Sequence, residues 1–199
     1  KLKINKKKID VPLQAIDLNK LNISPFKIPA TNVGVCEIFR SFTPEKLKRI
    51  QTDGLYQQKD EKEIQRIKSS AHNVNAPCFL FSRFTGNRFP NQNEIRDLIN
   101  VSYSYSDATP IPALPDVFKK QITRTNRKGR EVTETKIKVT KDDFKAYIDF
   151  LDKYIDKINE WNHKDILGII PHYFGSAQVR ELVDFYYKKN VKHFYFDCN

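Results

Sequence analysis

The carboxyl-terminal segment, residues 166–199, reads as one strand–helix–strand unit. The apolar run Ile166–Ile170 is followed by Pro171, which cannot donate a hydrogen bond to a sheet ladder. Ser176 can cap a helix, and Val191–Phe196 is rich in the aromatic and β-branched residues typical of strands. A crossover of this length joins parallel neighbours, and parallel strands need several partners and cover on both faces. The sequence therefore predicts an α/β protein with a largely parallel sheet. Either earlier segments supply the rest of that sheet, or the sequence is part of a longer chain.

The middle of the chain alternates strand and helix patterns. Strands are expected at 33–39, 78–81 and 100–105, and helices from Pro44, over 60–72, around 95–99 and over 140–161. The last of these is the strongest, because Thr140 and Asp143 can form a capping box. Together with the final unit, about five strands can be counted, whereas a closed barrel needs eight. The predicted fold is a largely parallel sheet with flanking helices, either doubly wound or an incomplete (β/α) barrel.

The net charge of +11 is concentrated in two places. Residues 1–10 carry five lysines and one aspartate, and residues 119–141 carry nine basic and two acidic side chains, so the remainder is balanced. Residues 1–32 contain three prolines and no sustained periodicity, which indicates a basic amino-terminal arm and an irregular lead-in to a domain over 33–199. Segment 119–141 alternates threonine or aliphatic residues with charges around a Lys128-Gly129 turn, which predicts an inserted basic β-hairpin.

A narrow basic ribbon is suited to the phosphates of RNA or DNA, because their neutralisation releases counterions. The predicted contacts are Lys119, Lys120, Arg124, Arg127, Lys128, Arg130, Lys136 and Lys138. An acidic protein is the alternative partner, and a solvated charged hairpin without a partner is the simplest interpretation. Four aromatic residues are candidates for base stacking, namely Phe84, Phe89, Tyr103 and Tyr105.

Polar residues follow several of the predicted strands, and ligands of parallel α/β proteins bind beyond the carboxyl ends of the strands. Asp107, His172 and Asp197 are therefore the candidates for acid–base or nucleophilic catalysis. Arg40 and Arg83 are the candidates for binding phosphate. Against this interpretation, strand ends are exposed and polar in most proteins.

Several classes of protein are disfavoured by what the chain lacks. It has no apolar run of membrane-spanning length and no signal-peptide pattern, which favours a cytoplasmic protein without a membrane partner. The three cysteines and four histidines have no short ligand spacing, so neither a metal site nor a disulfide framework is expected. No glycine-rich phosphate loop or common hydrolase motif occurs, and no cofactor is predicted.

The segment Thr109-Pro110 through Ala113-Leu114-Pro115 and Val117 resembles part of the tRNA-guanine transglycosylase family, and the final unit ending in Asp197 resembles part of a (β/α) barrel. The resemblance covers fewer than about fifty residues. It implies a transferase that exchanges a base in RNA with aspartates at strand ends, to which Asp107 and Asp197 would correspond. The family's Ser-Gly-Gly-Phe-Gln segment and cysteine-rich zinc site are absent here.

The functional expectation is an α/β protein that engages nucleic acid, as the amino-terminal part of a barrel-like enzyme acting on a nucleotide or base. The alternative is a non-enzymatic nucleic-acid-binding or assembly protein that uses the basic hairpin.

Overall fold

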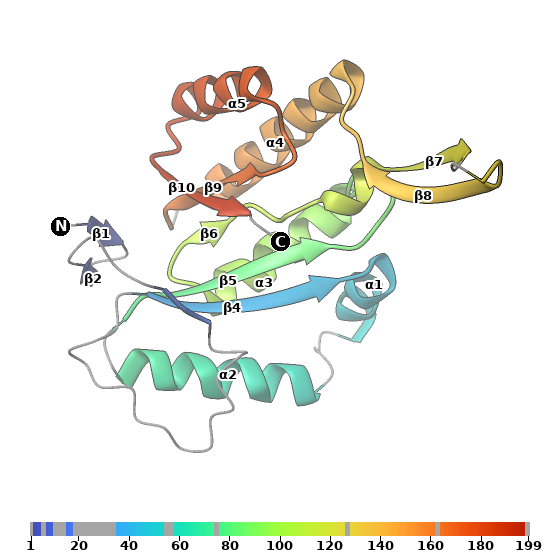
Figure 1. Ribbon diagram of the computed structural model, residues 1–199. Coiled ribbons are helices and arrows are strands. Elements are labelled where there is room, and N and C mark those ends of the chain that lie inside the picture. Colours follow the sequence, from blue (N-terminus) through green and yellow to red (C-terminus); the bar gives the residue numbers. More distant parts are fainter. Residues whose placement is uncertain are drawn as a thin grey trace.

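A computed structural model describes residues 2–4, 7–9, 15–17, 35–53, 58–73, 76–125, 128–161 and 164–197 (Figure 1). The strands are β1 (Leu2–Ile4), β2 (Lys7–Ile9), β3 (Ala15–Asp17), β4 (Val35–Phe42), β5 (Cys78–Phe84), β6 (Thr109–Pro110), β7 (Lys119–Thr125), β8 (Glu131–Ile137), β9 (Ile166–Pro171) and β10 (His193–Asp197). The helices are α1 (Pro44–Asp53), α2 (Gln58–Asn73), α3 (Gln92–Tyr105), the 3₁₀ turn η1 (Pro115–Phe118), α4 (Lys141–Trp161) and α5 (Ser176–Lys188).

The main sheet is parallel and follows chain order. β3, β4 and β5 pair in parallel, and so do β6, β9 and β10. The two groups are joined beside β5, where Phe84 N donates to Ala113 O and Ala113 N donates to Ser82 O, each at 2.9 Å. The order β3-β4-β5-β6-β9-β10 therefore contains no reversal. Its outermost strands, β3 and β10, do not pair within the described residues, so no closed barrel forms there.

The helices cover one face of this sheet, which we call the outer face. Crossovers of one hand between strands in chain order place every helix on the same side. Cys36, Ile38 and Leu80 point to that side and share the main core with residues of all five α-helices. Phe79 and Phe81 alternate with them and belong to a second, smaller cluster without helical residues. Figure 1 shows α3 behind the strands, with α2 and α4 to either side.

Helix α4 confirms the capping box expected at its start. Asp143 N donates to Thr140 Oγ1 at 3.1 Å, and Thr140 N donates to Asp143 Oδ2 at 3.0 Å. Because apolar residues recur at helical spacing, one stripe of the helix enters the main core, and Tyr147, Leu151 and Tyr154 are at most 1% exposed. The longest helix of the described chain thus forms where local sequence and packing agree.

The strand expected at 100–105 was wrong, because α3 continues through Tyr105. Asn91 and Glu94 close a capping box at its start, and Leu98, Val101 and Tyr105 keep the buried stripe at helical spacing to its end. The carbonyl groups at that end are satisfied by lysines: Lys68 Nζ donates to Ser104 O at 2.6 Å, and Lys164 Nζ donates to Ser106 O at 2.7 Å. The aromatic and β-branched composition of this segment favoured a strand, but tertiary packing selected the helix.

Two further expectations need correction. Ser176 is the first residue of α5 rather than its cap; the cap is Gly175, whose N–H donates to Gln178 Oε1 at 2.9 Å. The amino-terminal region is not wholly irregular, since β1 and β2 pair antiparallel and β3 pairs with β4. The rest of 1–32 lies outside the described residues.

The inserted hairpin is confirmed. β7 and β8 pair antiparallel over seven residue positions, from Lys119 opposite Ile137 to Thr125 opposite Glu131. Strands β4 and β5 point toward the end of the sheet from which this hairpin projects (Figure 1). The insertion therefore lies at the carboxyl edge of the parallel strands, where α/β proteins bind ligands.

Candidate functional site

Arg83 stands at the carboxyl end of β5 and is tied to the base of the hairpin. Its Nη2 lies 3.0 Å from Asp116 Oδ1, and Lys119 Nζ lies 2.6 Å from the same oxygen. Burial tends to raise the pKa of Asp116, but the hydrogen bonds from Lys119 and Arg83 outweigh it and hold that pKa below its ordinary value. One carboxylate thus fixes two cations, one from the sheet and one from the first residue of β7.

His172 and Tyr173 follow the end of β9, beside the end of β10. His172 N donates to Asp197 O at 3.2 Å, and His172 Nδ1 lies 2.9 Å from the same carbonyl oxygen. Burial raises the pKa of the Tyr173 hydroxyl, the charges of Asp197 and Asp116 raise it further, and Arg83 opposes them. These mutual effects place the side chains of β5, η1, β9 and β10 in one electrostatic neighbourhood.

Two buried polar atoms in this neighbourhood lack hydrogen-bond partners among the described residues. They are Arg83 Nε and the Tyr173 hydroxyl oxygen. Buried polar groups are nearly always satisfied, so these two atoms are exceptions to the usual pairing. We call Arg83, Asp116, Lys119, His172, Tyr173 and Asp197 the edge cluster.

The structure brings together three of the predicted site residues and separates two. Arg83, His172 and Asp197 lie in the edge cluster. Arg40 points from β4 to the outer face, where its Nη2 lies 3.2 Å from Glu63 Oε1 of α2. Asp107 lies at the opposite, amino end of β5, because its Oδ2 accepts from Cys78 N at 2.8 Å.

Both displacements have a structural reason. Asp107 was expected to end a strand, but it follows helix α3 and precedes β6, so it lies at the amino edge of the sheet. Arg40 and Arg83 point to opposite faces of the sheet, because successive side chains of a strand alternate between the faces. Arg40 is the register partner of Ser82, which faces the helices, whereas Arg83 is the register partner of Ser41. Tyr173 was expected beside His172 at a strand end but was given no role. Asp116 was missed as a site residue, since no local pattern distinguishes it; only Pro115 before it signalled a turn.

The basic hairpin displays its charges on the surface. Exposed side chains include Lys119, Lys120, Arg124, Lys128, Arg130, Lys136 and Lys138, while Arg127 lies outside the described residues. Lys120 and Lys136 are directly opposite each other, an arrangement that costs free energy in a two-stranded ribbon. Each has an acidic neighbour, Asp143 at 3.2 Å from Lys120 and Glu134 at 2.8 Å from Lys136.

The four aromatic residues expected to stack on bases are poorly placed for it. Phe84 is fully buried and Tyr105 is 6% exposed. Phe89 packs against Phe118 and Phe150, with ring centroids 6.1 and 5.7 Å apart. Tyr103 lies under Lys164 Nζ, 4.4 Å from the ring centroid. The exposed phenylalanines of the parallel strands are instead Phe39 of β4 and Phe194 and Phe196 of β10, which are 37%, 40% and 74% exposed.

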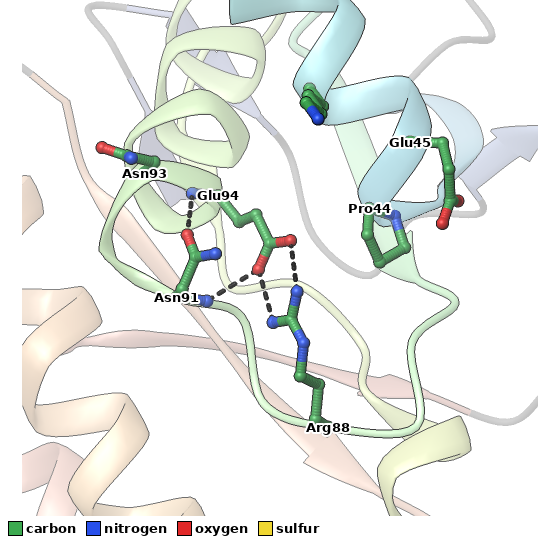
Figure 2. A pocket seen from close by; sticks show the side chains of 7 residues that line it. Pro44, Glu45, Arg88, Asn91, Asn93 and Glu94 are labelled. Carbon is green, nitrogen blue, oxygen red and sulfur yellow. Dashed lines mark hydrogen bonds and ion pairs between the residues drawn. The ribbon is translucent and has the colours of Figure 1, made fainter.

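A pocket of about 390 Å³ opens between the amino ends of α1 and α3. Figure 2 shows Arg88 pointing from the loop after β5 to Glu94 of α3, with Glu45 and Pro44 on the far side. The Arg88 guanidinium binds Glu94 through two hydrogen bonds of 2.7 and 2.8 Å, which hold the pKa of Glu94 below its ordinary value. The Arg88 guanidinium is therefore already paired with the Glu94 carboxylate, which is 7% exposed. We interpret this pocket as a structural contact between the two helices.

The described residues contain neither a candidate metal site nor a helix that could cross a membrane. No group of three or more histidine, cysteine or acidic side chains is arranged to hold a metal ion in the described ranges. Within the same ranges, none of the helices combines the length and apolar character needed to cross a membrane.

Comparison with known proteins found no matching family model, no similar curated protein and no similar solved structure. The fold and the site therefore define the chain only as a mixed α/β protein with a parallel sheet in chain order and a basic hairpin at its carboxyl edge.

Proposed function

We propose that this protein binds nucleic acid through the β7–β8 hairpin and presents it to the edge cluster. The observation that carries the proposal is the shared carboxylate: Asp116 contacts Lys119, the first hairpin residue, and Arg83, at the end of β5. Asp116 holds these two cations next to each other, so positive side chains continue from the hairpin to the strand ends.

The charge pattern of the hairpin supports a phosphate backbone as the ligand. Lys120, Arg124 and Lys136 share one face of the ribbon, because β-strand side chains alternate. A row of phosphates would relieve the repulsion between the opposed lysines and release counterions. Threonines on the other face, with Thr123 Oγ1 and Thr133 Oγ1 3.2 Å apart, offer additional hydroxyl donors.

The proposal also includes an enzymatic role. We propose that the described sheet is the amino-terminal part of a (β/α) barrel, and that His172 and Asp197 act on a nucleotide or base held at the carboxyl edge. Support comes from the chain order of the strands and from the position of these residues after β9 and in β10. The alternative is a non-enzymatic binding protein. In it, the hairpin also binds nucleic acid, and the edge cluster contacts the nucleic acid without catalysing a reaction.

The hairpin is tested by fluorescence anisotropy with labelled RNA and DNA between about 50 and 200 mM salt. We expect the triple variant Lys120→Ala, Arg124→Ala and Lys136→Ala to bind more weakly and to lower the slope of log K against log salt by about 2 for single strands. The matched control is Lys153→Ala, Lys188→Ala and Lys192→Ala, which removes the same charge from exposed positions elsewhere. Equal losses in the two variants would show general attraction to a basic protein and refute the hairpin assignment.

The enzymatic part needs a separate measurement. Nucleosides from RNA and DNA incubated with the protein are analysed by mass spectrometry, with Asp197→Asn and His172→Ala as comparisons. A chemical change that both variants abolish without loss of binding would support the enzyme. Unaltered nucleosides in every arm would favour the binding protein.

A further inference from the structure

The β7–β8 hairpin is a projecting ribbon that is accessible on both of its faces. It pairs with no further strand among the described residues, and Figure 1 shows it extending away from the body of the protein. All of its strand residues are exposed except Ile122 and Ile137, which are partly exposed. The side chains of both faces can therefore contact a ligand.

The face opposite the charged one is uncharged over its central register pairs. There, Gln121 lies opposite Thr135, and Thr123 lies opposite Thr133. We call these four residues the polar face. Amide and hydroxyl groups both donate and accept hydrogen bonds, whereas a phosphate only accepts them. Base edges present donors as well as acceptors, so the polar face is better matched to base edges than to a phosphate backbone.

The dimensions of the ribbon suit one groove of one kind of duplex. Its two strands lie about 4.8 Å apart, as in any sheet. The major groove of B-form DNA is about 12 Å wide and admits a two-stranded ribbon. In A-form RNA the major groove is deep and narrow, and side chains cannot read it. The shape of the hairpin therefore favours double-stranded DNA over double-stranded RNA.

We propose that the β7–β8 hairpin enters the major groove of double-stranded DNA with its polar face toward the base edges. This inference rests on the proposed function and names its substrate class. Gln121 can form a bidentate pair of hydrogen bonds with adenine, and the threonine methyl groups can pack against the methyl group of thymine. The polar face thereby gives the protein a sequence preference, which charge alone does not supply.

The charged face has a compatible role in this arrangement. With the polar face toward the bases, the charged face points out of the groove, and its long side chains can bend back to the phosphates on either side. β7 supplies Lys120 and Arg124 to one side, and β8 supplies Lys136 to the other. The two faces of the ribbon thus divide the reading of bases from the binding of the backbone.

The test first selects a preferred sequence from DNA duplexes of about 16 base pairs with a randomised centre. Anisotropy at one salt concentration then compares this duplex with a scrambled DNA duplex, with the RNA duplex of the same sequence and with the separate strands. We expect the preferred DNA duplex to bind most tightly. Gln121→Ala should weaken its binding about 5-fold to 150-fold and leave the scrambled duplex unchanged. Gln65→Ala, at an exposed position of α2, is the matched control.

A second variant keeps the test decisive if Gln121→Ala disturbs the hairpin. The double variant Thr123→Val and Thr133→Val retains the β-branched shape that suits a strand but removes both hydroxyl groups. It should lose preference for the selected duplex while keeping the salt dependence of binding, because no charge is removed.

Three results would overturn the inference: selection without a preferred sequence, RNA duplex or single strands bound as tightly as the preferred DNA duplex, or polar-face variants that keep the full preference. If the triple charge variant of the hairpin loses binding but one of these results is found, only this inference fails. If the triple charge variant binds normally, the proposed function itself fails.

Discussion

The two faces of the same strands differ in what they contribute. On the outer face Cys36, Ile38 and Leu80 are completely or almost completely buried under helices. On the inner face the alternate residue Phe39 is 37% exposed, and the smaller apolar cluster on that face contains no helical residue. The difference indicates that the helix-covered outer face supplies most of the stability of the fold, whereas the proposed binding residues lie at the carboxyl edge of the strands. Substitutions on the outer face and at the carboxyl edge should therefore separate stability from affinity.

The largest contrast is expected between Leu80 and Phe39. Leu80→Ala would leave a cavity in the helix-covered core and should lower the free energy of unfolding by about 2–5 kcal/mol. Phe39→Ala removes a larger side chain, but that side chain is 37% exposed, so we expect a smaller cost of about 1–2 kcal/mol. Urea denaturation of both variants measures the difference. Equal costs would contradict the division between the faces.

A smaller effect concerns two tyrosines of the helical layer. The Tyr186 hydroxyl of α5 donates to Ile169 O at 3.1 Å and accepts from Ile169 N at 3.2 Å. Tyr186→Phe leaves both backbone groups of a buried strand without that partner and should cost about 1–3 kcal/mol.

The matched comparison is Tyr154→Phe in α4. The Tyr154 hydroxyl is buried and has no hydrogen-bond partner among the described residues, and burial raises its pKa well above the ordinary value. Its removal should be neutral or slightly stabilising, because no hydrogen bond is lost. Thermal unfolding of the two variants side by side tests the pair, and a cost for Tyr154→Phe as large as that for Tyr186→Phe would contradict it.

The smallest expected effect depends on pH. Hydrogen bonds from Arg88 hold the pKa of Glu94 below its ordinary value of 4.5, so the ionised form stabilises the folded state. This contribution is present above pH 4.5 and is lost as the pH falls through the lowered pKa. We expect Glu94→Gln to lower the free energy of unfolding by about 1 kcal/mol near neutral pH, a modest value because Arg88 is half exposed. In acid, the difference in stability between the variant and the wild type should disappear.

Asp116→Asn, at the carboxyl edge of the sheet, is the comparison for Glu94→Gln. It frees Arg83 and Lys119 from a shared negative charge, so nucleic acid should bind more tightly. Glu94→Gln should leave affinity unchanged. Denaturation between about pH 3 and 7, with anisotropy at neutral pH, checks both variants. If Glu94→Gln remains less stable than the wild type in acid, the carboxylate charge is not the cause of its lower stability.

Local patterns predicted much of the fold and part of the site. The capping residues and apolar stripe of α4 identified that helix, and alternating threonines and charges identified the hairpin, because both signals lie within one segment. His172 and Asp197 were assigned to strand ends for the same reason. The segment 100–105 was misassigned, since its composition suits a strand while the packing of α3 against its neighbours keeps it helical.

The amino-acid sequence by itself determined the element types with strong local signals, the uneven charge and the parallel pairing of the last two strands. Tertiary structure alone decided that Arg83 contacts Asp116 at the carboxyl edge while Arg40 faces α2, and that Asp107 lies at the opposite edge. The physical reason is that a strand turns successive side chains to opposite faces, so one position of register decides which face receives each residue. Register depends on contacts between segments far apart in the chain, which no local pattern specifies.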